Sequence, residues 1–199
     1  MSEQSNDKQA LDQGIDQSRR KFAKVGVAAP VIMTLASKPV FGAQCLSQMM
    51  SGNASHQDGS CQLGWSPGGW CGDVGRVGGM LTRDAWEEAG FIMADKVCKG
   101  KGNGNGKCTY TDGSKVSDTP FSAPSGSPDI TMLEVICDPR IDQELRHCLT
   151  AYLNASLSEK VSNFTYILTK AQVVGICDGS IPLPQGYISL NSFLDSTWN

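Results

Sequence analysis

The sequence lacks the closely spaced cysteines and histidines that build most metal and redox sites. Its 199 residues include two histidines and eight cysteines, and neighbouring cysteines are separated by at least nine residues. A C-x-x-C pair and an H-E-x-x-H pattern are both absent. These absences argue against an ordinary zinc site, thioredoxin-like redox chemistry and covalent haem attachment. We therefore expect no metal and no cofactor.

The sequence also lacks an excess of positive charge and a long hydrophobic run. The formal net charge is −3, which divides into +2 for residues 1–43 and −5 for residues 44–199. An acidic domain is a poor partner for the phosphates of nucleic acid, so we expect none. The apolar stretch at residues 25–36 covers about 18 Å as a helix, well short of the roughly 30 Å hydrocarbon core of a membrane.

Basic residues precede this apolar stretch in the order of an export signal. Residues 18–24, SRRKFAK, resemble the twin-arginine motif S-R-R-x-F-L-K of bacterial signal peptides, with Ala23 where leucine is usual. The resemblance implies the twin-arginine (Tat) export machinery as a partner and a location in the periplasm, at the cell surface or outside the cell. Cleavage near residue 43 and retention as a membrane anchor both stay open. The residues of the signal are Ser18, Arg19, Arg20, Phe22 and Lys24.

All eight cysteines lie after residue 43, in the part that export would deliver to an oxidising compartment. An even, dispersed set in a small exported domain predicts disulfides rather than free thiols. We expect Cys98–Cys108 to close a glycine-rich loop, and Cys148 to pair with either Cys137 or Cys177. The candidate disulfide cysteines are Cys45, Cys61, Cys71, Cys98, Cys108, Cys137, Cys148 and Cys177.

The overall pattern predicts a mainly α, small, loop-rich single domain that is cross-linked by disulfides. Residues 1–43 read as a disordered n-region plus the signal peptide, and residues 44–199 as the exported domain. Within that domain we expect loops, one helix, a Gly/Ser-rich loop and a helical part, at 44–79, 80–97, 98–128 and 129–199 respectively.

The helical part carries the clearest periodicity. Apolar residues recur at helical spacing over 141–156, which predicts a long amphipathic helix. Residues 169–172, TKAQ, spell a capping box that opens a short helix. We expect a last helix over about 189–198.

A serine in a glycine-rich turn raises the question of a hydrolase. Residues 64–68, GWSPG, match the G-x-S-x-G pattern of a nucleophile elbow, which would make Ser66 the nucleophile. The next residue of an elbow donates its backbone N–H to the oxyanion hole, but Pro67 has none to donate. Bases are also scarce, because His56 lies in a loop and His147 lies off the apolar face of its helix. We therefore expect no catalytic residue, and the sequence favours a protein that is not an enzyme.

A glycine-rich loop superficially resembles a calcium-binding loop. Residues 101–112 place a glycine at the sixth position and Asp112 at the twelfth, as in an EF-hand. Lys101 occupies the first ligand position and Lys107 follows the glycine, so two positive charges oppose cation binding. We expect a loop without metal.

Three tryptophans flank the serine-containing turn and the helix after it. If exposed, Trp65, Trp70 and Trp86 could stack on sugars or anchor a partner, and they are possible binding aromatics. If buried, they complete a small core, which is the favoured interpretation in a domain of this size.

Three separated parts of the chain resemble a domain of bacterial exported and surface proteins. That domain opens with a C/S-P-G-Y-W turn and later carries an R-x-A-V-A-A-L-L-N-A helix followed by Y-x-L-T-x-x-x-V. The matching parts here are residues 66–70 (SPGGW), 146–155 (RHCLTAYLNA) and 166–173 (YILTKAQV). The chain departs from the pattern at Gly69, where tyrosine is usual, and at 71–73, where a lysine and a nearby histidine are common. The resemblance implies a helical architecture, a surface context and a structural turn that places Trp70 in the core, but no reaction.

These observations favour a non-catalytic exported domain with a structural or interaction role in the bacterial envelope or at the cell surface. The surface protein or glycan that it contacts is not identified by the sequence. Two alternatives stay open. One is a carbohydrate- or envelope-binding module that uses exposed tryptophans, and the other is an enzyme of a class that the sequence does not reveal.

Overall fold

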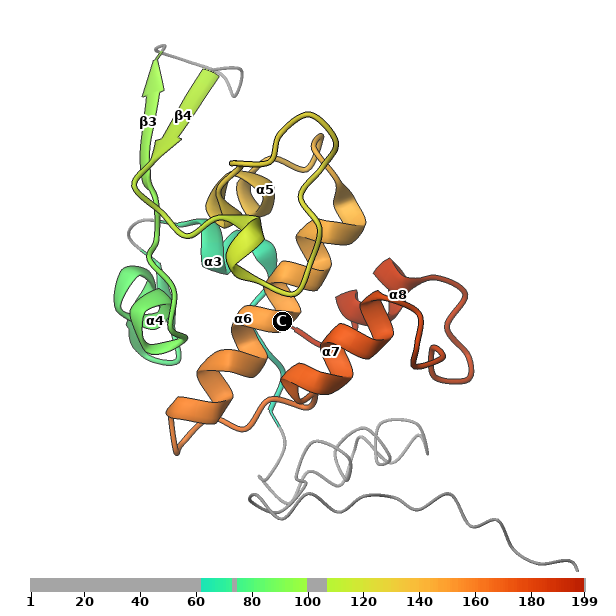
Figure 1. The fold of residues 1–199 in the computed structure, drawn as a ribbon. Helices are drawn as coiled ribbons and strands as arrows, with labels where there is room; N and C mark the ends of the chain where they lie inside the picture. Colours follow the sequence, from blue (N-terminus) through green and yellow to red (C-terminus); the bar gives the residue numbers. More distant parts are fainter. Residues whose placement is uncertain (1–61, 73–74, 100–106, 199) are drawn as a thin grey trace, which may run out of the picture. The chain divides into compact units, whose positions relative to one another are not determined.

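The computed structural model describes residues 62–72, 75–99 and 107–198 (Figure 1). The export-signal residues Ser18, Arg19, Arg20, Phe22 and Lys24 lie outside the described residues, as do His56, Cys45 and Cys61. The expectations for these residues stay predictions.

Helices are the main regular elements of the described part, and loops connect them over much of its length. One helix is much longer than the others, and a single 3-10 turn, η1, covers Val116–Asp118. The helices are α3 (Pro67–Cys71), α4 (Thr82–Glu88), α5 (Met132–Cys137), α6 (Gln143–Lys160), α7 (Lys170–Cys177) and α8 (Leu190–Asp195).

Two short antiparallel hairpins complete the regular structure. Strand β1 (Arg76–Val77) pairs with β2 (Met80–Leu81), and strand β3 (Asp95–Lys99) pairs with β4 (Lys107–Thr111). The second hairpin projects from the helices in Figure 1. Cys98 and Cys108 are opposite each other in its register.

Helix α6 is the centre of the fold, and it contacts α3, α4, α5, α7 and α8 (Figure 1). Its N-terminus is capped by Asp142, whose Oδ1 accepts the backbone N–H of Leu145 at 3.0 Å. Leu149, Leu153 and Leu157 are fully buried along its length. Because other helices cover it on several sides, polar residues of α6 are also buried, and these residues determine how the surrounding segments pack.

The two ends of the described chain lie side by side. The backbone N–H of Gln62 donates to the carbonyl of Thr165 at 2.8 Å, and that of Gly64 donates to the carbonyl of Thr197 at 2.8 Å. Below them, the Tyr166 hydroxyl bonds to Oγ1 of Thr197 at 2.6 Å in a fully buried position. Residues 62–64 are thereby attached to the C-terminal part of the domain.

The structure confirms the small, loop-rich domain with helical content and disulfides, and it confirms the main helices of the C-terminal part. The long helix runs over Gln143–Lys160 where 141–156 was expected. The capping box is present, because Thr169 Oγ1 accepts the N–H of Gln172 at 3.2 Å and Gln172 Oε1 accepts the N–H of Thr169 at 2.8 Å. The terminal helix, α8, is shorter than expected.

The prediction of one helix over 80–97 is correct for Thr82–Glu88 and wrong beyond it. Helix α4 ends at Glu88, and Gly90 follows with a φ of +89°, a left-handed conformation that glycine adopts without strain. The chain then enters strand β3. The expected Gly/Ser-rich loop over 98–128 likewise contains β4 and η1. Strand pairing across the Cys98–Cys108 disulfide overrides the weak local preferences of this region.

Candidate functional site

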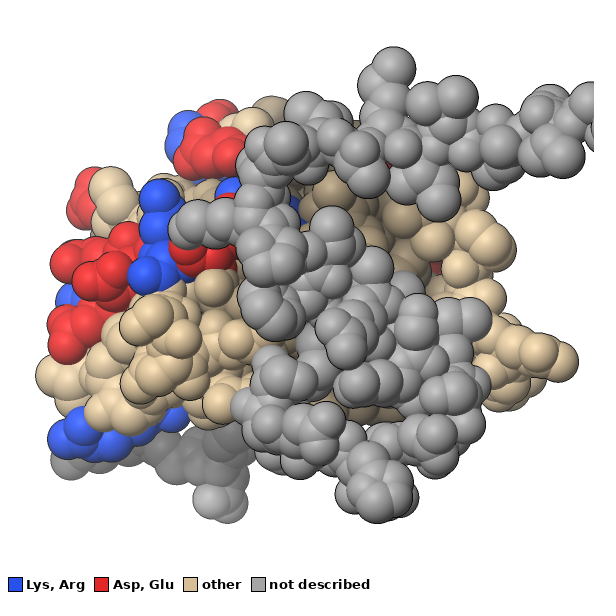
Figure 2. All heavy atoms as spheres, turned by 90° about the horizontal axis from the view of Figure 1, so that it is seen from below, with Lys and Arg blue, Asp and Glu red and all other residues tan. Residues whose placement is uncertain are grey.

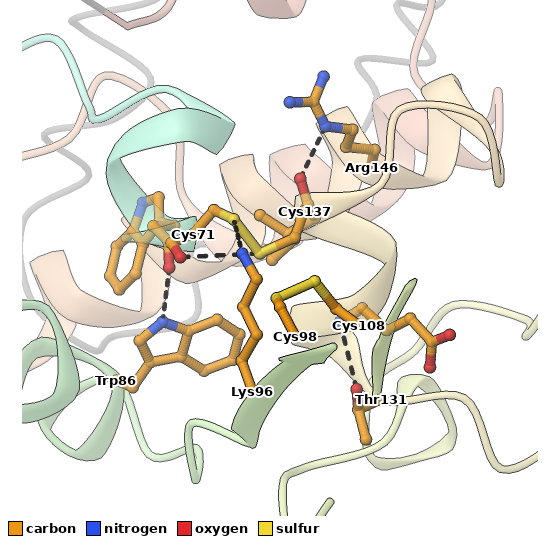
Figure 3. Close-up of a disulfide and its surroundings, with 11 residues drawn as sticks. Cys71, Trp86, Lys96, Cys98, Cys108, Thr131, Cys137 and Arg146 are labelled. Atoms are coloured by element: carbon orange, nitrogen blue, oxygen red, sulfur yellow. Dashed lines mark hydrogen bonds between the residues drawn. A yellow bond between two sulfur atoms is a disulfide. The ribbon is translucent and has the colours of Figure 1, made fainter. Parts of the chain in front are cut away.

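Three disulfides connect the six cysteines in the described part of the chain. Cys98–Cys108, which the sequence predicted, links the strands of the β3–β4 hairpin. Cys148–Cys177 ties α6 to α7 and decides between the two partners that the sequence left open for Cys148. The third, Cys71–Cys137, joins the last residues of α3 and α5 and was not predicted (Figure 3). Together they are compatible with an oxidising environment.

The serine-containing turn begins helix α3 and is not arranged as a nucleophile elbow. Ser66 is the N-cap residue in an extended conformation, and its side chain does not cap the helix. Its carbonyl accepts the backbone N–H groups of Gly69 and Trp70. Pro67 occupies the first helical position, where its missing N–H costs no hydrogen bond. The glycines and the proline therefore shape a turn that directs Trp70 into the core.

Two of the three candidate binding tryptophans are inaccessible. Trp70 and Trp86 each have 0% exposed surface, which confirms the favoured interpretation that they are buried and excludes both as binding aromatics. The Trp86 indole N–H donates to the carbonyl of Trp70 at 3.1 Å, and the two rings meet edge to face with 6.0 Å between their centroids. Trp65 is only partly buried and packs on Phe164 with 4.6 Å between ring centroids. Trp65 is therefore the member of the three with surface left for a ligand.

A buried asparagine organises the turn from the opposite side. Asn154 of α6 is fully buried, and its Oδ1 accepts both the backbone N–H of Trp65 at 3.0 Å and the indole N–H of Trp70 at 3.1 Å. Its amide nitrogen donates to the carbonyl of Trp65 at 2.9 Å. A Cβ at Gly64 would lie 2.5 Å from this amide, so glycine is needed there for the close approach. The sequence reasoning missed Asn154, although an asparagine among apolar residues of a central helix is a signal for a buried polar contact.

A lysine lies against the Cys71–Cys137 disulfide. The ammonium of Lys96, from β3, is 3.6 Å from Sγ of Cys71 in a partly buried position (Figure 3). A positive charge beside sulfur stabilises a thiolate if the bond is broken. Strand β3 therefore places a positive charge where it favours the thiolate of Cys71 on reduction of the disulfide.

His147 is buried, so its expected position on the helix surface is wrong. It is 3% exposed, because α8 and the C-terminal Trp198 cover that side of α6. Its Nε2 lies 3.6 Å from a carboxylate oxygen of Asp195, and its Nδ1 has no hydrogen-bond partner among the described residues. Burial is the main influence and lowers the pKa of His147; the Asp195 charge and the side chain of Asn191 raise it, and the Arg146 charge lowers it further.

A pocket of about 300 Å³ opens beside the Cys148–Cys177 disulfide. Its walls come from the loop after η1, the start of α6, the end of α7 and the start of α8. Apolar side chains and carboxylates both line it, and among the described residues of the lining none is Lys, Arg or His. The pocket was not predicted, because four segments that are far apart in the sequence form it.

The charged side chains of the described residues are partly visible from below the view of Figure 1. Where the described residues are visible, acidic and basic side chains lie next to one another (Figure 2). Paired charges occur elsewhere in the described residues as well, as in Arg83–Asp95 at 3.0 Å and Lys170–Glu159 at 2.7 Å.

Within the described residues, no group of three or more His, Cys, Asp or Glu side chains is arranged to hold a metal ion. No described helix combines the length and the hydropathy needed to cross a membrane. Comparison of the chain with protein-family models, with curated proteins and with solved structures finds no match. The arguments about function therefore rest on the residues themselves.

Proposed function

We propose that this protein is a non-catalytic exported domain that acts through contacts with other envelope or surface molecules. The observation that carries the proposal is the direction of two buried polar side chains, Asn154 and Tyr166. The amide of Asn154 and the hydroxyl of Tyr166 are bonded to the fold itself, and disulfides join the ends of α3 and α5 and the helices α6 and α7. An enzyme site needs polar groups aimed at a substrate instead.

The export part of the proposal is supported by the twin-arginine resemblance and by the disulfides. It is tested by fractionating a bacterial host that produces the full chain. The double substitution Arg19→Lys with Arg20→Lys keeps the charge and removes the motif, and we expect it to keep the protein in the cytoplasm. The control Lys21→Arg, at the variable position of the motif, is expected to leave export intact. Cytoplasmic wild-type protein, or export of the double variant, would contradict the proposal.

The interaction part of the proposal is tested in the same cells. Chemical cross-linking in the envelope fraction, followed by mass spectrometry, is expected to recover the same partner in repeated preparations. The opposite result would be that the protein turns over envelope material and that a single Ser, Asp or Glu substitution abolishes this activity without unfolding the chain. That result would show an enzyme.

One second function has a specific observation in its favour. Trp65 is partly exposed beside Phe164, and an accessible indole is a typical platform for a sugar ring. A carbohydrate- or envelope-binding module would retain polysaccharide or isolated cell wall and would lose that retention on Trp65→Ala. Because the side chain of Trp65 packs on Phe164, unchanged circular dichroism of the variant is the required control.

A further inference from the structure

The pocket beside the Cys148–Cys177 disulfide has a negatively charged rim. Asp142 and Glu144 stand at the start of α6, and Asp178 follows the last residue of α7. None of the three forms an ion pair with a described residue. Hydrogen bonds from Ser180 lower the pKa of Asp178, which keeps that carboxylate charged at neutral pH.

The dipoles of the two helices act in opposite directions on this rim. The end of α7 contributes negative partial charge next to Asp178. The start of α6 contributes positive partial charge, which Asp142 and Glu144 offset, and Asp142 uses Oδ1 to cap the helix. The combined field of the rim therefore favours a cation.

The lining of the pocket also includes apolar residues and one aromatic residue. Leu145, Leu190 and the disulfide contribute apolar surface, and Phe121 contributes an aromatic wall. Phe121 is itself held by an edge-to-face contact with Tyr152, with 5.5 Å between ring centroids. A hydrated metal ion gains nothing from these apolar residues, whereas an organic cation can pack its alkyl chain on them while its charge meets the ring and the carboxylates.

We infer that this pocket binds the guanidinium of an arginine side chain that a partner protein presents. The planar guanidinium fits best, because it stacks on an aromatic wall and donates to several carboxylates at once. The volume of about 300 Å³ is at the lower end for ligand pockets and suits one long side chain rather than a larger ligand. The inference rests on the proposed interaction function and specifies the chemistry of the contact.

The test is an NMR titration of the full chain with its disulfides formed. The probe is N-acetyl-arginine amide, and its neutral isostere N-acetyl-citrulline amide is the matched control. We expect the arginine probe to shift the amide signals of Phe121, Leu145 and Leu190 with a dissociation constant on the order of millimolar. We expect added salt to weaken binding and citrulline to produce no shifts.

Substitutions that remove single charges complete the test. Glu144→Gln and Asp178→Asn are each expected to weaken binding about two- to fivefold, since exposed ion pairs contribute little individually. Glu88→Gln, on the exposed face of α4, is the control and should bind like the wild type. Equal shifts with citrulline, no shifts with arginine, or unchanged binding by both pocket variants would overturn the inference.

Two further outcomes separate this inference from its alternatives. Agmatine, which carries a free amine as well as a guanidinium, separates a small ligand from a side chain. If agmatine binds and N-acetyl-arginine amide does not, the occupant is a small amine and the inference of an arginine side chain is wrong. If the chain is exported and cross-links to a partner but does not bind the arginine probe, the inference about the pocket is wrong and the proposed function is not affected. A chain that stays in the cytoplasm would refute the proposed function, whatever the titration gives.

Discussion

Asn154 shows how one side chain can determine the position of a whole turn. Its amide satisfies both backbone groups of Trp65 and the indole of Trp70 within a fully buried region. Each of these groups would be left without a partner if the amide were removed, and an unsatisfied buried polar group costs free energy. The serine-containing turn therefore depends on a residue of α6 that is 84 positions from Trp70.

Replacing this side chain should strongly destabilise the protein. Asn154→Ala is expected to lower the free energy of unfolding by about 3 kcal/mol, because it leaves three polar groups unpaired and creates a cavity. Urea unfolding monitored by tryptophan fluorescence measures the change. Asn163→Ala, at an exposed position, is the control and should have almost no effect. Equal stabilities of the two variants would contradict the role given to Asn154.

Lys96 should control which sulfur leaves when the Cys71–Cys137 disulfide is reduced. An external dithiol is expected to attack Cys137, so that Cys71 leaves as a thiolate beside the ammonium 3.6 Å away. Lys96→Met should slow this reduction roughly fivefold, the effect of about 1 kcal/mol of lost charge stabilisation. Timed alkylation and mass spectrometry follow each disulfide. Lys99→Met, on the exposed part of the same strand, is the control, and an equal slowing by both variants would exclude a specific effect of Lys96.

At the scale of elements, α8 is attached to α6 across a buried histidine. The folded protein holds His147 with a lowered pKa, while the unfolded chain titrates near the ordinary value of 6.5. Below that value the unfolded state binds more protons at His147 than the folded state does. The stability that comes from burying the neutral imidazole is therefore complete at higher pH and is lost as the pH falls. Packing of α8 and Trp198 on α6 should weaken in acid.

Stability measured against pH tests this contact. The urea midpoint of the wild type is expected to fall between about pH 8 and about pH 5, and His147→Gln should show a smaller fall because it carries no titrating group there. Phe193, on the buried side of α8, gives local amide exchange rates that report the same change. If the urea midpoint of His147→Gln falls as steeply with pH as that of the wild type, groups other than His147 cause the pH dependence.

The elements that the sequence predicted correctly are those with a local signal. Helix α6 has a capping aspartate and a repeated apolar face, and α7 has a capping box within four consecutive residues. The β3–β4 hairpin has no such signal in its apolar pattern, because its strands are largely exposed; a disulfide joins its paired residues Cys98 and Cys108. The helix expected over 80–97 ends early because Gly90, just after α4, adopts a positive φ, which apolar periodicity does not reveal.

At the scale of the whole molecule, the sequence predicted which side chains are buried better than it predicted which residues they contact. The sequence indicated that the tryptophans would be buried, and this is correct for Trp70 and Trp86. It did not indicate Asn154 as the partner of Trp65 and Trp70, nor that α8 covers His147, because both depend on packing between distant segments. The same limit applies to the pocket, whose four walls are brought together only by the fold.

The described domain is held together by long-range covalent links as well as by its core. Cys71–Cys137 closes a separation of 66 residues and Cys148–Cys177 one of 29. Such links limit the freedom of the unfolded chain, and they persist in oxidising compartments rather than in a reducing cytosol. The central claim, an exported domain, therefore depends on these bonds being present in the protein that the cell makes.

Disulfide mapping of the native protein tests this claim most directly. The full chain is isolated from the envelope and cytoplasmic fractions of a bacterial host under immediate thiol alkylation, digested without reductant and analysed by mass spectrometry. We predict envelope protein with the peptides of Cys71–Cys137, Cys98–Cys108 and Cys148–Cys177 joined in those pairs. Cytoplasmic protein with these six cysteines alkylated would contradict the account.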